Sequence, residues 1–209
     1  MKEVEYVTEK KPKTKKEILV EAEKHYKKGV KYGQAGDAVE AINSWTKVVE
    51  LIPDHFDAWY NLGNAQFFGK GNIELGFACW EKALQIKPDD IDTLYNIGNA
   101  LRELGQFEKA IEIYTKVVTL QPDDHEAWNN MANAYYGNDE INKAIECWKK
   151  AVEINPSKFE TWSNLSRVYY QLEELELALE AIQKVVELVP KSSNAKKFMK
   201  AIQDALTHE

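Results

Sequence analysis

Asparagine is the residue type whose spacing in this chain suggests a chemistry. Its side-chain amide both donates and accepts hydrogen bonds, so it can pair with a backbone N–H and C=O together. Two series recur at spacings of 35, 34 and 34 residues: the first is Asn61, Asn96, Asn130 and Asn164, and the second is Asn64, Asn99, Asn133 and Arg167. Asparagine is a mediocre helix former, so helix propensity does not explain these positions. A ladder of amides suits an extended peptide that is bound through its main chain.

Aromatic residues accompany the two series. Five tyrosines stand at fixed offsets from them, namely Tyr26, Tyr60, Tyr95, Tyr136 and Tyr170. Arg102 takes the same offset as Tyr136 and Tyr170 one repeat earlier, and it adds a cation to the candidate surface. A second interpretation stays open, in which the asparagines bond across neighbouring helices of the protein itself, because buried amides need partners in either case.

The elements that position these residues recur with the same period. Five of the six prolines fall at spacings of 35, 34, 34 and 34 residues: Pro53, Pro88, Pro122, Pro156 and Pro190. Within each period, apolar residues at i, i+3 and i+4 predict two amphipathic helices. Polar residues such as Asp90 and Asp124 are expected to cap the first helix, and breaks at Gly71, Gly105, Asp139 or Glu173 separate it from the second. A fixed period in this range indicates a solenoid.

Several recurring positions resemble the tetratricopeptide repeat. The resemblance rests on Trp59-x2-Leu62-Gly63, Trp128-x2-Met131-Ala132-x2-Tyr135, Ala144-x3-Trp148 and the closing Pro156. It implies an all-α, right-handed superhelical solenoid of antiparallel helix pairs. The expected organisation is a Lys-rich arm and lead-in over 1–21, five repeats over 22–192, and a capping helix over 193–209. The repeat bounds are 22–55, 56–90, 91–124, 125–158 and 159–192.

Three segments depart from the repeat pattern. In the first repeat, His25 takes the tryptophan position, as is expected of a terminal repeat that meets water on one side. The second repeat carries one extra residue within 66–71, which predicts a bulged helix or a longer turn. After Pro190, Ser193 is expected to cap a last helix that buries Phe198 and Ile202.

Composition excludes several classes of function. The chain has 209 residues and a net charge of −7, which disfavours a nonspecific nucleic-acid binder. We expect no membrane span, no metal site and no cofactor, because the chain has no long apolar run and only four scattered histidines. Cys79 and Cys147 hold equivalent positions two repeats apart, so we expect both to be free thiols. Residues 69–72 lack phosphate-loop spacing, and the sequence therefore predicts no enzyme.

The first 16 residues are the one strongly basic part of the chain. The run from Lys10 to Lys16 resembles a nuclear import signal. Two other interpretations are a solvated arm and a segment that docks onto the acidic array. A cytoplasmic location is expected, with a nuclear one if the run is an import signal.

The resemblance implies an interaction protein rather than a catalyst. The leading hypothesis is an adaptor that binds an extended, neutral or basic segment of a partner protein in the concave groove. A self-assembling scaffold, with the chain as a homo-oligomer, and an accessory substrate-recognition subunit of an enzyme complex stay open. Binding of acidic chaperone tails is disfavoured, because none of the positions that would supply the clamping lysine is Lys: Tyr26, Tyr60, Tyr95, Asn129 and Ser163.

Overall fold

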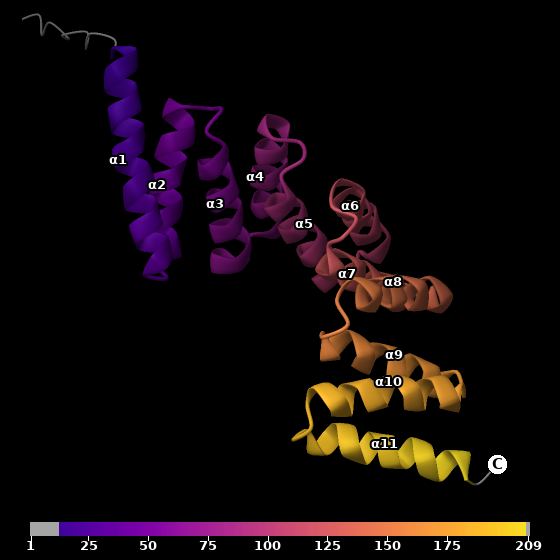
Figure 1. Cartoon of the computed structure of the whole chain (residues 1–209). Coiled ribbons are helices and arrows are strands. Elements are labelled where there is room, and N and C mark those ends of the chain that lie inside the picture. The colour runs from indigo at the N-terminus through magenta and orange to yellow at the C-terminus, as the bar shows by residue number, and fades with distance from the viewer. Residues whose placement is uncertain (1–12, 208–209) are drawn as a thin grey trace, which may run out of the picture. The chain divides into compact units, whose positions relative to one another are not determined.

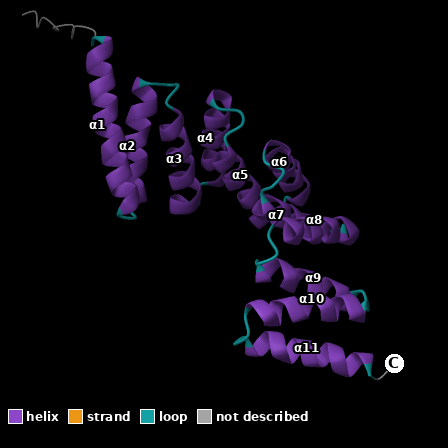
Figure 2. Ribbon diagram, in the orientation of Figure 1, coloured by secondary structure: helices purple, strands orange, loops and turns teal. Residues whose placement is uncertain are grey.

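A computed structural model describes residues 13–207, and this part of the chain contains helices and turns but no strand (Figures 1 and 2). The predicted all-α class is confirmed. The helices in chain order are α1 (Lys15–Gln34), α2 (Ala38–Leu51), α3 (Phe56–Asn64), η1 (Ala65–Gly69), α4 (Ile73–Ile86), α5 (Ile91–Glu103), α6 (Phe107–Leu120), α7 (His125–Gly137), α8 (Ile141–Ile154), α9 (Phe159–Gln171), α10 (Leu175–Leu188) and α11 (Ser193–Leu206).

The chain divides into two compact units, one ending at Thr93 and one beginning at Leu94. In the first unit α1 packs on α2, α2 on α3, and α3 on α4. In the second unit each helix from α6 to α11 packs on the next, and Figure 1 shows α9, α10 and α11 side by side. Each helix buries its apolar stripe against its neighbours, which is the packing expected of a repeat array.

Side-chain caps set where several helices begin. Asp90 and Asp124 accept hydrogen bonds from backbone N–H groups of the first turns of α5 and α7, as the sequence predicts. The cap of α11 is Ser192 rather than the predicted Ser193, because Ser192 is extended and its hydroxyl accepts from the Ala195 N–H. α1 begins at Lys15, within the expected lead-in, and Thr14 forms a capping box with Glu17. The rest of the Lys-rich run, Lys10 to Pro12, lies outside the described residues.

The turn inside each repeat uses a left-handed backbone conformation. The predicted break residues all have positive φ, and so does the equivalent residue of the first repeat; these are Gly36, Gly71, Gly105, Asp139 and Glu173, with φ between 59° and 76°. Glycine adopts this conformation without steric cost, whereas Asp139 and Glu173 do not. The fourth and fifth repeats therefore make the same turn under more backbone strain.

The turn between repeats is held by indole groups. Trp59, Trp128 and Trp162 each donate from Nε1 to the carbonyl oxygen of the proline six residues earlier, at 2.7, 2.9 and 2.9 Å. The recurring Trp and Pro of the sequence are thus direct hydrogen-bond partners. Each bond ties the start of a first helix to the end of the preceding second helix.

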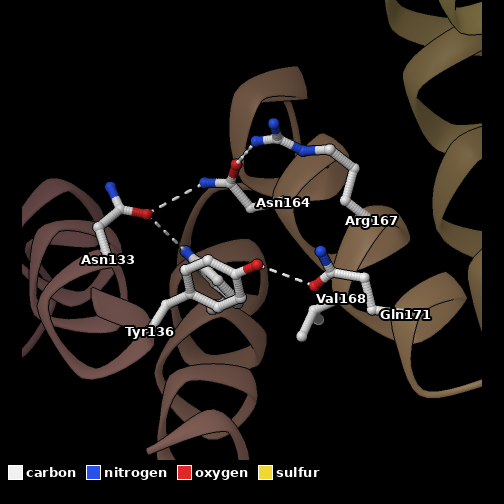
Figure 3. Close-up of a pocket in the computed structure, with 7 residues that line it drawn as sticks. Asn133, Tyr136, Asn164, Arg167, Val168 and Gln171 are labelled. Carbon is white, nitrogen blue, oxygen red and sulfur yellow. Dashed lines mark hydrogen bonds between the residues drawn. The ribbon is translucent and has the colours of Figure 1, made fainter. Parts of the chain in front are cut away.

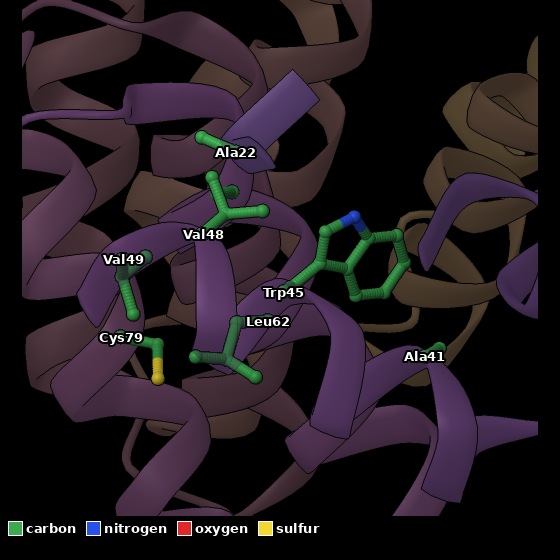
Figure 4. Close-up of a cluster of buried hydrophobic side chains, with 8 residues drawn as sticks. Ala22, Ala41, Trp45, Val48, Val49, Leu62 and Cys79 are labelled. Atoms are coloured by element: carbon green, nitrogen blue, oxygen red, sulfur yellow. The ribbon is translucent and has the colours of Figure 1, made fainter. Parts of the chain in front are cut away.

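Small residues let the two helices of a repeat approach each other. A Cβ placed on Gly29 or Gly63 would lie 2.5 Å or 2.4 Å from the ring of Trp45 or Trp80. Trp45 belongs to a core of the first unit that includes Ala22, Val48 and Leu62 (Figure 4). Ala132 takes the position of Gly63 in the fourth repeat, and both Ala132 and Trp148 are buried there.

The extra residue of the second repeat is accommodated inside a helix. η1 is a single π-helical turn that continues α3, so the predicted bulged helix is confirmed and a lengthened turn is not needed. Phe67 within η1 packs on Gly76 and contacts the rings of Phe77 and Trp80. These contacts compensate for the irregular backbone.

Candidate functional site

The second asparagine series accepts hydrogen bonds from rings of the second helices. Asn64 Oδ1 accepts from Trp80 Nε1 at 2.9 Å, and Asn133 Oδ1 accepts from Trp148 Nε1 at 3.2 Å. Asn99 Oδ1 accepts from the Tyr114 hydroxyl at 2.7 Å. In each repeat the amide lies on the first helix, 15 or 16 residues before the ring. The structure therefore assigns these oxygens the interhelical role that the sequence left open.

The two terminal repeats lack this pairing of an asparagine with a ring of the second helix. In the first repeat Val30 takes the asparagine position, and the buried Trp45 Nε1 has no partner among residues 13–207. In the fifth repeat Ile182 replaces the ring and brings no donor, and the corresponding position is Arg167. An asparagine is thus present wherever the second helix offers a buried donor, except opposite Trp45.

The members of the first asparagine series differ in their contacts. Asn61 donates to the Tyr26 hydroxyl at 3.4 Å, and Asn164 donates to Asn133 Oδ1 at 3.2 Å. Asn130 is half-buried, and no residue from 13 to 207 hydrogen bonds to its side chain. Asn61 belongs to the first unit, whereas Asn96, Asn130 and Asn164 belong to the second. Asn130 is therefore the amide with a free donor and acceptor.

A polar hollow of about 180 Å³ lies over α7, α8 and α9 (Figure 3). Asn133, Tyr136 and Trp148 line one side, and Asn164, Arg167, Val168 and Gln171 line the other. Besides the bonds of Asn133, Tyr136 OH donates across the hollow to Gln171 Oε1 at 2.8 Å, and Arg167 Nη2 donates to Asn164 Oδ1 on the same wall at 2.6 Å. Four of the predicted residues thus meet here.

A second hollow of about 240 Å³ opens between the first turns of α7 and α9. It contains Asn130, together with Asn129, whose Oδ1 accepts from the Thr161 hydroxyl at 3.2 Å. Acidic groups mark its edge, where Glu126 pairs with Lys158 at 3.2 Å. Glu160 also lines this hollow, and no cation between residues 13 and 207 forms an ion pair with it. The open carboxylate favours a basic group in a ligand.

The predicted tyrosines have different environments. Tyr26 stacks on His55 with ring centroids 5.0 Å apart, and Tyr60 stacks on Phe56 at 6.2 Å. Tyr95 donates to Asp124 Oδ2 at 2.6 Å, and burial together with this carboxylate raises the pKa of its hydroxyl. Tyr170 contacts Phe198 edge to face at 5.3 Å. Only Tyr136 belongs to the polar hollow described above.

Arg102 lies beside the buried ring of Tyr114. Burial raises the pKa of the Tyr114 hydroxyl to about 12, and the Arg102 guanidinium opposes that rise. Arg102 Nε is itself buried without a hydrogen-bond partner in the described chain. Arg167, in contrast, is exposed, and no carboxylate of residues 13–207 pairs with it. Of the two predicted groove arginines, Arg167 is the one available to a ligand.

Other sequence features have structural roles. Cys79 and Cys147 are buried free thiols, as expected, and burial raises the pKa of both to about 11. His55 caps α3 through Nδ1, which accepts from the Ala58 N–H, and His125 begins α7. Residues 13–207 contain no group of three or more His, Cys, Asp or Glu that is arranged to hold a metal. None of the helices in this range has the length and hydropathy to cross a membrane.

Comparison with protein families assigns the repeats. Models described as tetratricopeptide repeat match residues 26–91, 79–112, 125–158 and 159–192, and one described as TPR repeat matches 98–139. The chain is a tetratricopeptide repeat protein. The family consists in general of non-catalytic adaptors, and membership supports a protein-interaction scaffold for this TPR protein.

Known proteins share the fold of this TPR protein. MamA from Desulfovibrio magneticus RS-1 has a TM-score of 0.75 and 22% identity, over 83% of this chain and 97% of that one. YrrB, described as a TPR protein with an unusual peptide-binding site, has a TM-score of 0.73 and 22% identity, over 88% and 95%. PilF from Pseudomonas aeruginosa has a TM-score of 0.72 and 18% identity, over 91% and 86%.

One curated relative also matches in sequence. An uncharacterized protein from Methanocaldococcus jannaschii is 44% identical over 45 residues, which are 22% of this chain. The TPR chain thus spans about half the length, 52%, of that relative. Such a short match adds to the evidence for the repeat and carries no activity to this protein.

Sequence reasoning missed some residues of the two hollows. Gln171 and Val168 follow no asparagine or tyrosine series, so their spacing gave no signal. Asn129 entered only as a position where a clamping lysine is lacking, yet it joins α7 to α9 through Thr161. A search for polar residues next to the first asparagine series identifies Asn129.

Proposed function

We propose that this TPR protein is an interaction adaptor and that its second unit binds an extended segment of a partner protein across α7 and α9. The observation that carries the proposal is Asn130, a half-buried amide with no internal side-chain partner, in a hollow that opens between two first helices. A half-buried amide without a partner loses hydrogen bonds to water, and a peptide backbone restores both its donor and its acceptor interactions.

The geometry of the second unit fits an extended chain. First helices of neighbouring repeats are about 8–10 Å apart in such packing, and an extended peptide rises about 3.3 Å per residue. One step from Asn130 on α7 to Asn164 on α9 therefore corresponds to about three peptide residues. Because Asn133 and Asn164 already bond to each other, their free N–H groups orient the segment while Asn130 provides the full main-chain contact.

The charges around the two hollows favour a segment of low net charge. Glu160 at the edge of the first turns attracts a basic side chain, whereas Arg167, seven residues later on α9, attracts an acidic one. Seven helical residues correspond to about 10 Å, or about three extended residues. YrrB, which has the same fold, is described as having a peptide-binding site, and this supports the class of ligand proposed here.

The test uses peptides of unbiased sequence. Dodecapeptides displayed on phage are selected on the wild-type protein, and the affinity of the best synthetic peptide is measured by calorimetry. Asn130→Ala is expected to weaken this affinity about three- to tenfold, the effect of losing one or two net hydrogen bonds of about 0.5–1.5 kcal/mol. The melting temperature is expected to stay at the wild-type value, because no internal bond is removed.

Asn142→Ala is the matched control, because Asn142 is exposed on α8 and lines neither hollow. It makes the same change outside the proposed surface and should leave the affinity unchanged. Equal affinities of Asn130→Ala and wild type would contradict the proposal. A fall in melting temperature that accompanies unchanged affinity would instead assign Asn130 to the packing of the repeats.

A further inference from the structure

A third hollow has the most apolar walls of the three. It has a volume of about 300 Å³ and lies between α9, the end of α10 and α11. Its apolar walls are Phe159, Ile182, Val185, Val189, Ala195 and Phe198. This volume is at the small end of the range for ligand pockets, about 300–1,000 Å³, and fits a single bulky side chain better than a whole cofactor.

The pocket exists because α11 breaks the polar pattern of the preceding helices. Between α7 and α9 the gap is bridged by three side-chain hydrogen bonds, from Thr161 to Asn129, Asn164 to Asn133, and Tyr136 to Gln171. α11 has Phe198 at the position that Asn164 holds in α9, 34 residues earlier. Phe198 contacts the ring of Tyr170 and makes no polar bridge, so the space beside it stays open and apolar.

Arg167 connects this apolar pocket with the polar hollow, since its side chain lines both. One of its terminal nitrogens donates to Asn164 Oδ1, which fixes the guanidinium at the boundary. Arginine has five N–H donors, and no carboxylate among residues 13–207 pairs with those of Arg167. An exposed guanidinium held at the rim of an apolar pocket is complementary to a ligand that combines an apolar group with a carboxylate.

We propose that the pocket between α9 and α11 binds a bulky apolar side chain of a partner segment, and that an acidic side chain two residues away in the same segment pairs with Arg167. In an extended chain, residues i and i+2 point to the same side and are about 6.6 Å apart. The segment therefore crosses α9 from the apolar pocket, past Arg167, toward the polar hollow. This inference rests on the proposed function, because it takes the occupant to be part of the same partner segment.

The experiment uses the capped tripeptide acetyl-Leu-Gly-Asp-amide and the full chain with labelled methyl groups. Titration should shift the NMR signals of Ile182 and Val185 in a saturable way. Acetyl-Ala-Gly-Asp-amide should bind about fiftyfold more weakly, because burying leucine in place of alanine adds about three carbon groups. Acetyl-Leu-Gly-Asn-amide should bind about two- to fivefold more weakly, the size of effect expected of an exposed ion pair.

Two substitutions test the two halves of the pocket. Arg167→Gln should abolish the preference for Asp over Asn, and Lys184→Gln, which removes an exposed charge that lies outside the pocket, should not. Ser163→Leu, which places a bulky side chain in the pocket, should weaken binding of both leucine peptides at an unchanged melting temperature. Equal shifts with all three peptides, or an Asp preference that survives in Arg167→Gln, would overturn the inference.

The two proposals fail separately. If the tripeptide does not shift Ile182 and Val185 while Asn130→Ala still weakens the selected dodecapeptide, only the apolar pocket is rejected. If the tripeptide binds as described and Asn130→Ala has no effect, the main-chain contact in the adaptor proposal is rejected instead. Asn130→Ala itself should leave tripeptide binding unchanged, because Asn130 does not line this pocket.

Discussion

The first and fourth repeats place a tryptophan at the same position of the second helix, Trp45 and Trp148, yet they treat its N–H group differently. Both rings are buried, with 5% and 3% of their surface exposed. Trp148 donates to Asn133, whereas Val30 stands at the equivalent position in the first repeat and Trp45 Nε1 has no acceptor in the described chain. The other buried members of its cluster are Ala, Val, Leu and Cys, whose side chains have no oxygen (Figure 4). Tyr26 and Tyr32 pack against this cluster, and neither hydrogen bonds to Trp45 Nε1.

This difference shows that the second asparagine series belongs to the core of the repeats. A buried donor without a partner costs about 1–3 kcal/mol, and a nearby amide removes that cost. The second series is therefore required for packing before it is available to any ligand. In the first series, Asn130 is the member whose side chain forms no hydrogen bond with residues 13–207.

The largest expected effect comes from making the fourth repeat like the first. Asn133→Val leaves the Trp148 N–H without an acceptor and also removes the acceptor of Asn164. We expect the free energy of unfolding to fall by about 1–3 kcal/mol, measured by urea titration. Asn142→Val on the exposed face of α8 is the control and should change it by less than about 0.5 kcal/mol. An Asn133→Val protein as stable as wild type would show that the hydrogen bond is not needed.

The second prediction concerns the close approach of helices in the first repeat. Gly29→Ala places a Cβ 2.5 Å from Trp45 Nε1, and the ring has little room to move because it is buried. Overpacking of about 1–3 kcal/mol outweighs the helix preference for Ala, which is about 0.5–1 kcal/mol. We expect a net loss of about 1–2 kcal/mol in the same titration. A Gly29→Ala variant that is more stable than wild type would mean that the ring adjusts freely.

The third prediction makes the first repeat like the fourth. Val30→Asn supplies the missing acceptor for Trp45 at a half-buried position. The free energy of unfolding should rise by about 0.5–1 kcal/mol, because the new bond outweighs the apolar contact that Val30 loses. Val30→Leu keeps the position apolar and should not show this gain. Equal stability of Val30→Asn and Val30→Leu would show that the unpaired Trp45 N–H group does not lower the stability.

The smallest expected effect is the pH dependence of stability that the two buried cysteines cause. Cys79 and Cys147 hold equivalent positions in the second and fourth repeats, and burial raises the pKa of each thiol from 9.0 to about 11. Because the folded pKa lies above the unfolded one, the stabilising contribution is complete below about pH 9 and is lost as pH rises toward 11. A variant with Ala at both positions should lose stability less steeply over this window. Alkylation monitored by mass spectrometry should give similar pH profiles for both thiols, and a reactive thiol at pH 8 would contradict the burial.

Much of the fold follows from local residue chemistry. The prolines and the tryptophans six residues later are hydrogen-bond partners, so a single sequence period contains both ends of the contact. The breaks at Gly105 and its equivalents were predicted from their spacing, and the structure adds that each of these residues has positive φ. The cap of α11 was misplaced by one residue, because Ser192 and Ser193 are chemically alike and only the backbone conformation distinguishes them.

The candidate site was harder to predict, because each side chain there has competing partners. Asn99 and Asn130 are both half-buried amides on first helices, yet one accepts from Tyr114 and the other is free. The signal was present in the second helix, since an asparagine accompanies a ring that carries a donor 15 or 16 residues later. The apolar pocket beside Phe198 had no such signal, because it depends on how three helices meet.

The π-helical turn η1 has a consequence for how such a chain changes length during evolution. Its extra residue is absorbed before Gly71, so the turn, α4 and every later repeat keep their phase despite the insertion. The same insertion in a short inter-repeat turn would separate a tryptophan from its proline. An extra residue in the first helix thus leaves this contact intact, whereas an extra residue at the end of a repeat would break it. Repeats of 35 residues among neighbours of 34 are the expected trace of that asymmetry.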